Sequence, residues 1–361
     1  MKICKKCIIP CSYPDITFKN GVCDLCEKNN LEIKKVLGEK KLLELLTSRK
    51  NNKYDCIVPL SGGKDSSYVL FYIAKKLELK PLAAFFDNGF TIELAKKNVE
   101  NICKKLGVDL ITGHATDFRL KQTKEALMAA KYLGKFVKIC GNCENNLRTF
   151  IINAATKQNI PFIIWGSTDF EDKSSRFTDN ASVTERETYG TFKSMLSKLK
   201  RSFSLLNCPA GFLNTLKAIF HALKFMYCCV QDNIASKSPE GCKNLNPFLE
   251  VSFKNKKPKT IYFFDYIKYD PYKNIETLKK EMEWQSLSEK EARMDCKLHC
   301  FVNYQHLKDY GITADGFTLS VLVRHNFISR EEAIKKEEIL KNGLKEECDK
   351  IAKELGVNNI F

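Results

Sequence analysis

Short apolar runs alternate with amphipathic helical patterns through the first half of the chain. Four apolar runs are short enough to be buried strands, namely 56–60, 81–87, 108–112 and 160–165. Four helical patterns follow or separate them, starting at Tyr68 and spanning 91–106, 119–133 and 144–158. Strands that alternate with helices predict an α/β fold with a doubly wound parallel sheet, in which the ligand site lies at the carboxyl ends of the strands.

The second half of the chain has a different pattern. Residues 191–204 and 211–230 form basic amphipathic helical patterns, followed by a polar loop at 236–258. Such helices normally pack on their own protein, although basic and aromatic character also fits a membrane surface or a partner. The last hundred residues are helical after a short apolar strand at 261–264, with capping boxes at Ser288 and Ser329. These patterns predict four regions: a cysteine-rich ribbon (1–30), an α/β domain (31–185), a helical insertion with a loop (186–260) and a mostly helical C-terminal region (261–361).

Charge and cysteine content limit the class of protein. The 361 residues carry a formal net charge of +16, which suits an anionic partner such as RNA, a nucleotide-activated sugar or a membrane surface without choosing among them. Sixteen cysteines and no apolar leader favour reduced thiols and metal binding over disulfides. We therefore expect a cytoplasmic protein.

The segment between the first apolar run and Tyr68 has the sequence Ser-Gly-Gly-Lys-Asp-Ser-Ser, residues 61–67. A strand that ends in two glycines and enters a helix turns several backbone N–H groups toward one point, at the positive end of the helix dipole. The serine hydroxyls can donate to phosphate oxygens there, and Lys64 adds a positive charge. The segment therefore predicts a phosphate-binding loop, and the simpler alternative is a glycine turn with a serine N-cap.

Asp65 refines this prediction. A carboxylate beside phosphate is unfavourable unless it holds Mg²⁺ or a ligand hydroxyl, so Asp65 indicates a magnesium–nucleotide complex. The spacing is not that of the Walker A motif, whose lysine follows a longer loop. It resembles the SGGxDS signature of the PP-loop ATP pyrophosphatases, which cleave ATP between the α- and β-phosphates and transfer AMP to an oxygen of the substrate.

Two Cys-x-x-Cys pairs near the N-terminus, Cys4 with Cys7 and Cys23 with Cys26, are separated by fifteen residues. This spacing is typical of a zinc ribbon, in which four thiolates at about 2.3 Å from one ion hold a segment too small to fold on its own core. The ribbon is either a folding staple, which we favour, or a docking module that faces the substrate.

A third pair, Cys140 with Cys143, is expected at the same edge of the sheet as the loop. Together with Cys296, and with His299 or Cys300 as a further ligand, it would form a second metal site. A closed site would hold zinc, whereas three cysteines and an open position would suit an iron–sulfur cluster. The alternative is unconnected thiols. Other polar or small residues that follow predicted strands belong to this edge: Asp87, Asn88, Asp117, Gly166 and Ser167.

The C-terminal half adds a third set of features to the ribbon and the loop. Its members are Phe264, Asp265, Tyr266, Ile267, Trp284, Arg293, Asp295, Cys296, Asn303, Tyr304, 322–324 and 328–333. Together the three features resemble the N-acetyl sugar amidotransferase family of the PP-loop superfamily, bacterial enzymes of lipopolysaccharide and flagellin sugar pathways, over nearly the whole chain. Residues 167–169 and 190–240 depart from the family pattern.

The resemblance implies conversion of a sugar acetamido group to an acetamidino group. The amide oxygen attacks the α-phosphate of ATP, pyrophosphate leaves, and ammonia displaces AMP, so that catalysis depends on positioning and charge stabilisation. Lys64 and Asp65 are the predicted catalytic residues, the first neutralising pyrophosphate and the second holding magnesium or orienting ATP. The other predicted ATP contacts are Ser61, Gly62, Gly63, Ser66, Ser67, Asp87 and Gly166, the last two by analogy of fold alone.

The resemblance also implies partners. A glutaminase domain of its own is not visible in the sequence, so ammonia is expected from separate glutaminase and barrel subunits similar to those of histidine biosynthesis. The expected substrate is a nucleotide-linked sugar; nucleic acid is not expected, and peripheral membrane contact through the basic helical patterns stays open.

Two other functions compete with this one. A PP-loop tRNA thiolase shares the adenylating loop and the basic charge, and would use a cluster or persulfide at Cys140, Cys143 and Cys296. A non-catalytic zinc adaptor would have lost the ATPase loop, and the intact loop argues against it.

Overall fold

The computed structural model describes residues 2–14, 16–27, 36–48, 53–115, 117–133, 139–168, 258–286 and 295–357, with a few positions between 216 and 228. The helical patterns at 191–204 and most of 211–230, the loop at 236–258 and the capping box at Ser288 lie outside these residues. In the described part of the chain, no helix is both long and apolar enough to cross a membrane.

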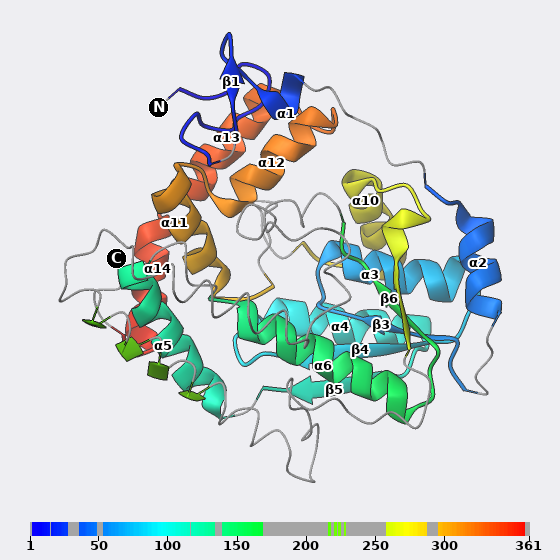
Figure 1. Cartoon of the computed structure of the whole chain (residues 1–361). Coiled ribbons are helices and arrows are strands. Elements are labelled where there is room, and N and C mark those ends of the chain that lie inside the picture. The colour runs from blue at the N-terminus through cyan, green and yellow to red at the C-terminus, as the bar shows by residue number, and fades with distance from the viewer. Residues whose placement is uncertain are drawn as a thin grey trace.

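Five parallel strands form the central sheet in the order β5-β4-β3-β6-β7 (Figure 1). They are β3 (Cys56–Pro59), β4 (Pro81–Asp87), β5 (Leu110–His114), β6 (Phe162–Trp165) and β7 (Lys259–Tyr262). Every residue of β3 and β6 is buried, as expected for strands covered on both faces. The predicted doubly wound α/β fold is confirmed. The chain reverses direction across the sheet between β3 and β6, which is where ligands bind in such folds.

Helices cover both faces of the sheet. Val58, Ala83 and Ile164 share one core with α3 (Lys64–Phe71) and α4 (Glu93–Leu106), whereas Ile57 and Ile163 share another with α6 (Gly141–Lys157). Alternate residues of one strand therefore serve opposite layers. A further helix, α5 (Phe118–Leu133), follows β5, and α2 (Glu39–Thr47) precedes β3.

Element boundaries differ slightly from the sequence prediction. The strand predicted at 108–112 is β5, which begins at Leu110, and the helix predicted from 144 begins at Gly141. Gly107 ends α4 in the left-handed conformation, as expected. The short strand predicted at 261–264 is β7, and it pairs in parallel with β6. Tertiary pairing thus makes this strand the edge of the main sheet.

The C-terminal region is helical, as predicted. It contains α10 (Pro271–Met282), which packs on α3, and then α11 (His299–Tyr310), α12 (Ala314–Arg324), α13 (Arg330–Lys341) and α14 (Leu344–Glu354). Ser329 Oγ caps α13 by accepting from Glu332 N at 3.0 Å, which confirms the predicted start of this helix.

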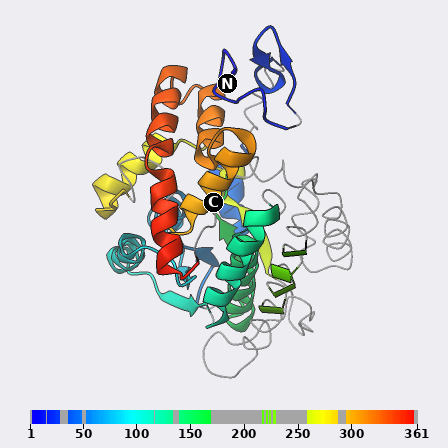
Figure 2. The ribbon, with the colours of Figure 1, turned by 90° about the vertical axis from the view of Figure 1, so that its left-hand side faces the viewer.

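The N-terminal segment packs on these C-terminal helices. It holds a small hairpin of β1 (Phe18–Lys19) and β2 (Val22–Cys23), followed by the single turn α1 (Asp24–Glu27). Tyr13 and Ile9 share an apolar core with Phe317 of α12 and Ala333 of α13. Figures 1 and 2 show this segment beside α12 and α13, with the sheet toward the other end of the molecule.

Candidate glycine loop and cysteine cluster

The glycine loop joins β3 to α3 at the carboxyl edge of the sheet. Gly63 is the N-cap of α3 and no side chain caps this end, so the first N–H groups of the helix are available to a ligand. Ser66 Oγ accepts from Ser61 N at 3.1 Å and lies 3.1 Å from Ser61 Oγ, which in turn accepts from Gly63 N at 3.3 Å. The hydroxyls and the N–H groups at the start of α3 thus lie together at one end of the helix, and such a group of donors suits phosphate.

Gly62 has to be glycine for two reasons. Its φ is +80°, a conformation that L-residues other than glycine rarely adopt, and a Cβ there would lie 2.2 Å from the carbonyl oxygen of Ala95 in α4. The loop therefore lies directly against α4, and its shape depends on that helix.

Asp65 is the buried acid of the loop. The residue is 9% exposed; its Oδ2 accepts from Lys64 Nζ at 2.6 Å and lies 3.5 Å from the hydroxyl of Tyr269. Its Oδ1 is buried and has no hydrogen-bond partner among the described residues. A buried carboxylate oxygen that lacks a partner is a suitable ligand for Mg²⁺, so the residues present fit the predicted magnesium–nucleotide complex.

Two other predicted ATP contacts follow the strands on either side of β3, namely β4 and β6. Gly166, after β6, packs against the backbone of Asp65, because a Cβ there would lie 3.4 Å from the Asp65 carbonyl. Asp87, at the end of β4, accepts from Gly89 N at 3.0 Å and pairs with Lys96 Nζ at 3.0 Å. Burial alone would raise the pKa of Asp87, but Lys96 and the Gly89 N–H outweigh it and hold that pKa below its usual range. Both residues lie at the predicted edge, and their contact with nucleotide stays a prediction.

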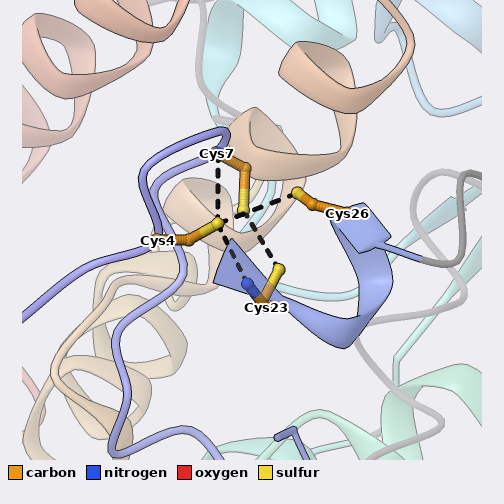
Figure 3. A group of neighbouring side chains, drawn as sticks. All are labelled: Cys4, Cys7, Cys23 and Cys26. Carbon is orange, nitrogen blue, oxygen red and sulfur yellow. Dashed lines mark hydrogen bonds between the residues drawn. The ribbon is translucent and has the colours of Figure 1, made fainter. Parts of the chain in front are cut away.

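The four N-terminal cysteines converge on one point (Figure 3). The Sγ atoms of Cys4, Cys7, Cys23 and Cys26 all lie within 4.8 Å of one another, at separations of 3.8 Å for Cys4–Cys26 and 3.7 Å for Cys7–Cys23. All four are buried. Cys4 Sγ also accepts from the backbone N–H groups of Lys6 and Cys23, at 3.4 and 3.3 Å. The arrangement could hold a metal ion, as the spacing predicted.

Residues of the C-terminal helices hold the cysteine cluster from outside. Arg330 Nε donates to the carbonyl oxygens of Cys4 and Cys7 at 3.1 and 3.0 Å, and Arg324 Nη1 lies 3.8 Å from Cys7 Sγ. Hydrogen bonds from Cys23 and Cys26, with a smaller contribution from Arg324, hold the pKa of the Cys7 thiol far below its ordinary value. The contacts of the two arginines tie the cluster to α12 and α13.

The second set of cysteines is more dispersed. In the described ranges only the N-terminal group brings three or more ligand atoms within 4.8 Å, so Cys140, Cys143 and Cys296 do not share that spacing. Cys296 is nevertheless tied to the sheet edge, because Asn88 Nδ2 donates to its Sγ at 3.5 Å and Thr91 forms a β-bridge with it. Burial raises the pKa of the Cys296 thiol, and Asp295 and Cys143 also raise it.

The two further ligands predicted for that site are engaged elsewhere. His299 Nε2 lies 3.0 Å from both carboxylate oxygens of Asp315 in α12. Cys300 is buried, and its thiol lies 3.4 Å from the carbonyl oxygen of Lys297 in the core between α11 and α14. The second metal site stays a prediction.

Sequence reasoning missed several residues that the fold brings to the loop edge. Trp284 and Asn98 both donate to the carbonyl oxygen of Gly62, and the Tyr269 hydroxyl donates to Asp65.

Arg119, in the first turn of α5, is a further buried polar residue, with an exposed fraction of 4%. Its Nε and Nη1 have no acceptor among the described residues, and its guanidinium lies 5.7 Å from the centre of the Phe90 ring. A buried guanidinium of this kind can bind a carboxylate or phosphate. Nothing in the local sequence marks Asn98, Tyr269 or Arg119 as neighbours of the loop, because they lie far from residues 61–67 along the chain. Trp284 is one of the residues that carry the family resemblance.

Comparisons with known proteins show limited likeness. No protein-family model matches the chain. Two uncharacterized proteins of Methanocaldococcus jannaschii, MJ1599 and MJ1016, are 32% and 31% identical over 109 and 116 residues, or 30% and 32% of this chain. The match spans about a third of the length of each of them, 34% and 36%.

One solved structure shows a weak overall likeness. The U34-tRNA thiolase NcsA from Methanococcus maripaludis, described with its [4Fe-4S] cluster, aligns over 95% of this chain and 89% of its own. The TM-score is 0.34 and the sequence identity is 14%.

Proposed function

We propose that this protein is an ATP pyrophosphatase that adenylates a carbonyl oxygen of its acceptor. The observation that carries the proposal is the position of the SGGKDS loop, which follows β3 at the point where the strand order reverses. Asp65 is buried there beside the uncapped start of α3, and its Oδ1 has no hydrogen-bond partner among the described residues. Open N–H groups and hydroxyls suit the departing pyrophosphate, and a buried acid that lacks a partner suits magnesium.

Each residue has a distinct part in this scheme. The N–H groups of the first turn of α3, with the Ser61 and Ser66 hydroxyls, would bind the β- and γ-phosphates. Lys64 neutralises the charge on the leaving pyrophosphate, which requires its ammonium to move from the Asp65 oxygen that it contacts at 2.6 Å. Asp65 would then hold the magnesium ion that supplies electrostatic stabilisation of the phosphates.

The metal proposed for the cysteine cluster is zinc. Four thiolates at about 2.3 Å from a tetrahedral ion lie about 3.8 Å apart. The Sγ separations of 3.8 and 3.7 Å agree with that edge length. Thiolates of an iron–sulfur cluster bind separate irons and therefore lie farther apart. The site has no open position for chemistry, which supports a structural role.

For the acceptor we propose the acetamido group of a nucleotide-linked sugar, on the basis of the sequence resemblance. The amide oxygen forms a bond to the α-phosphorus and the bond to pyrophosphate breaks. Ammonia then adds to the imidate carbon, AMP leaves with its oxygen, and the acetamidino group remains after loss of a proton. Separate glutaminase and barrel subunits would supply the ammonia, and a surface polysaccharide or flagellin glycan would be the final destination of the sugar.

Thiolation of tRNA is a second candidate that one observation favours. Cys296 is fastened to the loop after β4 and lies near enough to Cys143 for the charge of one to affect the pKa of the other. Hydrosulfide held beside these thiols would add to the adenylated carbon of the base, and AMP would leave with the oxygen, so that the oxidation state of sulfur does not change. The net charge of +16 is compatible with tRNA.

Product analysis tests the shared chemistry and separates the acceptors. The purified protein is incubated with ATP, Mg²⁺ and ammonium chloride, with either UDP-N-acetylglucosamine or bulk tRNA plus sulfide, and nucleotides are separated by chromatography. We expect AMP and pyrophosphate with the sugar. AMP formed only with tRNA, together with thiolated nucleosides, would show that the acceptor is tRNA and not the sugar. Formation of ADP would exclude adenylation of either acceptor.

A further inference from the structure

Two buried side chains converge on the carbonyl oxygen of Gly62. Trp284 Nε1 donates to it at 2.9 Å and Asn98 Nδ2 donates to it at 3.2 Å. Trp284 is 5% exposed and Asn98 is 2% exposed, so water does not compete effectively for this oxygen. Two donors from different regions of the chain thus bind one carbonyl of the glycine loop.

The direction of this carbonyl decides the direction of the next N–H group. In a trans peptide unit the C=O of Gly62 and the N–H of Gly63 point to opposite sides. The carbonyl points toward Trp284 and Asn98, and the Gly63 N–H accordingly points toward the Ser61 hydroxyl, 3.3 Å away. The N–H therefore lies on the side where the hydroxyls would meet phosphate.

The opposite orientation would be unfavourable for nucleotide binding. Two successive glycines can turn the peptide unit between them at little steric cost. A turned unit would place the Gly62 carbonyl on the hydroxyl side, where its partial negative charge would repel phosphate. Within the loop, the bond from the Gly63 N–H to the Ser61 hydroxyl favours the observed orientation. The two donors to the Gly62 carbonyl add to this selection from outside the loop.

We propose that Trp284 and Asn98 are positioning residues that hold the Gly62–Gly63 peptide unit in its phosphate-binding orientation. This inference rests on the proposed function of the loop as a triphosphate site. Neither side chain touches the nucleotide in this scheme; both act through the Gly62 carbonyl.

The two residues are themselves fixed by the fold. Asn98 Nδ2 donates to the Gln285 carbonyl at 2.9 Å, and Gln285 N donates back to Asn98 Oδ1 at 3.2 Å. Trp284 follows Glu283, which ends α10 in the left-handed conformation and pairs with Lys105 of α4 at 2.6 Å. Because α10 packs on α3, the C-terminal region positions the loop at the start of α3.

The test compares Trp284→Phe with a matched control in the full-length protein. Trp284→Phe removes the N–H and keeps an aromatic ring. The control, Tyr54→Phe, removes a 2.6 Å hydrogen bond to Asp109 from a buried ring of the same domain, away from the loop. In Trp284→Phe we expect ATP and pyrophosphate to bind about tenfold more weakly, which is the effect of one lost hydrogen bond to a buried group. Tyr54→Phe should bind both as the wild type does.

Amide hydrogen exchange in the nucleotide-free protein gives an independent measurement. Peptides that cover residues 60–67 should exchange faster in Trp284→Phe and remain unchanged in Tyr54→Phe. Benzothienylalanine at position 284, which keeps the indole shape and lacks the N–H, gives the same comparison if phenylalanine disturbs packing. Unchanged exchange together with unchanged ATP affinity would overturn the positioning role alone. Failure of the wild-type protein to bind ATP would overturn the proposed function, and the role of the two residues with it.

Discussion

The cysteine cluster and the glycine loop are both short sequence motifs, but different parts of the chain hold them in shape. The cluster closes within the first 26 residues, and the distant arginines, Arg324 and Arg330, hold its outside. The loop depends on distant residues for its shape, since Trp284 and Asn98 bind the Gly62 carbonyl. The ligands of the cluster thus all come from one short segment, although the C-terminal helices support it, whereas the shape of the loop depends on contacts made by the assembled domain.

The largest expected effect comes from opening the cysteine cluster. Cys7→Ser removes one of four ligands, and structural zinc contributes about 10–16 kcal/mol of folding free energy in zinc-finger peptides. We expect loss of bound zinc by elemental analysis and rapid proteolysis within residues 1–27. ATP affinity should stay within about twofold, because the cluster packs against α12 and α13, whereas Asn98 and Trp284 hold the loop. Cys11→Ser is the matched control, because Cys11 is exposed and outside the cluster. Loss of ATP binding in Cys7→Ser would show that the two regions are not independent.

A smaller but still large effect is expected from Gly62→Ala. The new Cβ would meet the Ala95 carbonyl at 2.2 Å, and a φ of +80° costs a non-glycine residue about 1–3 kcal/mol. We expect ATP affinity to fall more than tenfold in calorimetry, with zinc content unchanged. Gly107→Ala separates the two causes, since Gly107 also has positive φ but nothing lies within 4 Å of its Cβ position. Equal loss of ATP affinity in both variants would contradict the close approach to α4 as the reason.

The smallest expected effect is a pH dependence where the ribbon docks. His306 of α11 lies 3.1 Å from the Tyr13 hydroxyl, and burial lowers its pKa, although the Ile312 carbonyl and nearby acids partly offset this. Below the unfolded pKa of about 6.5 the unfolded chain gains a proton that the folded chain resists, so the free energy of unfolding should fall as pH falls. Above that pKa the contribution is constant.

Urea unfolding at pH 7.5 and 5.5 measures this dependence, with His306→Gln as the control that cannot titrate. The difference between the two pH values should be smaller in the variant than in the wild type. Equal differences in the free energy of unfolding would mean that protonation of His306 does not contribute to the pH dependence of stability. The protection factor of the glycine-loop amides, which is the exchange rate relative to that of an unstructured chain at the same pH, should be equal at the two pH values in either protein, which would again separate the two regions.

Much of the fold could be predicted because its signals are local. The apolar runs of β3, β4 and β6 and the glycine that ends α4 were readable from periodicity and turn chemistry, and so were the four cysteines that the structure gathers. Boundaries of β5 and α6 shifted by two or three residues because hydrogen-bond pairing with neighbouring elements decides where an element starts. The assignment of ATP contacts such as Asp87 stays a prediction.

The sequence by itself determined the α/β alternation, the loop with its acid and the ribbon of cysteines, because periodicity, glycine placement and ligand spacing are properties of neighbouring residues. Only the tertiary structure decided that β7 forms an edge of the sheet, that Arg330 supports the cysteine cluster and that Trp284 lies against Gly62, 222 positions away. The physical reason is that these contacts depend on how whole layers pack, and packing brings together side chains whose separation along the chain carries no periodic signal.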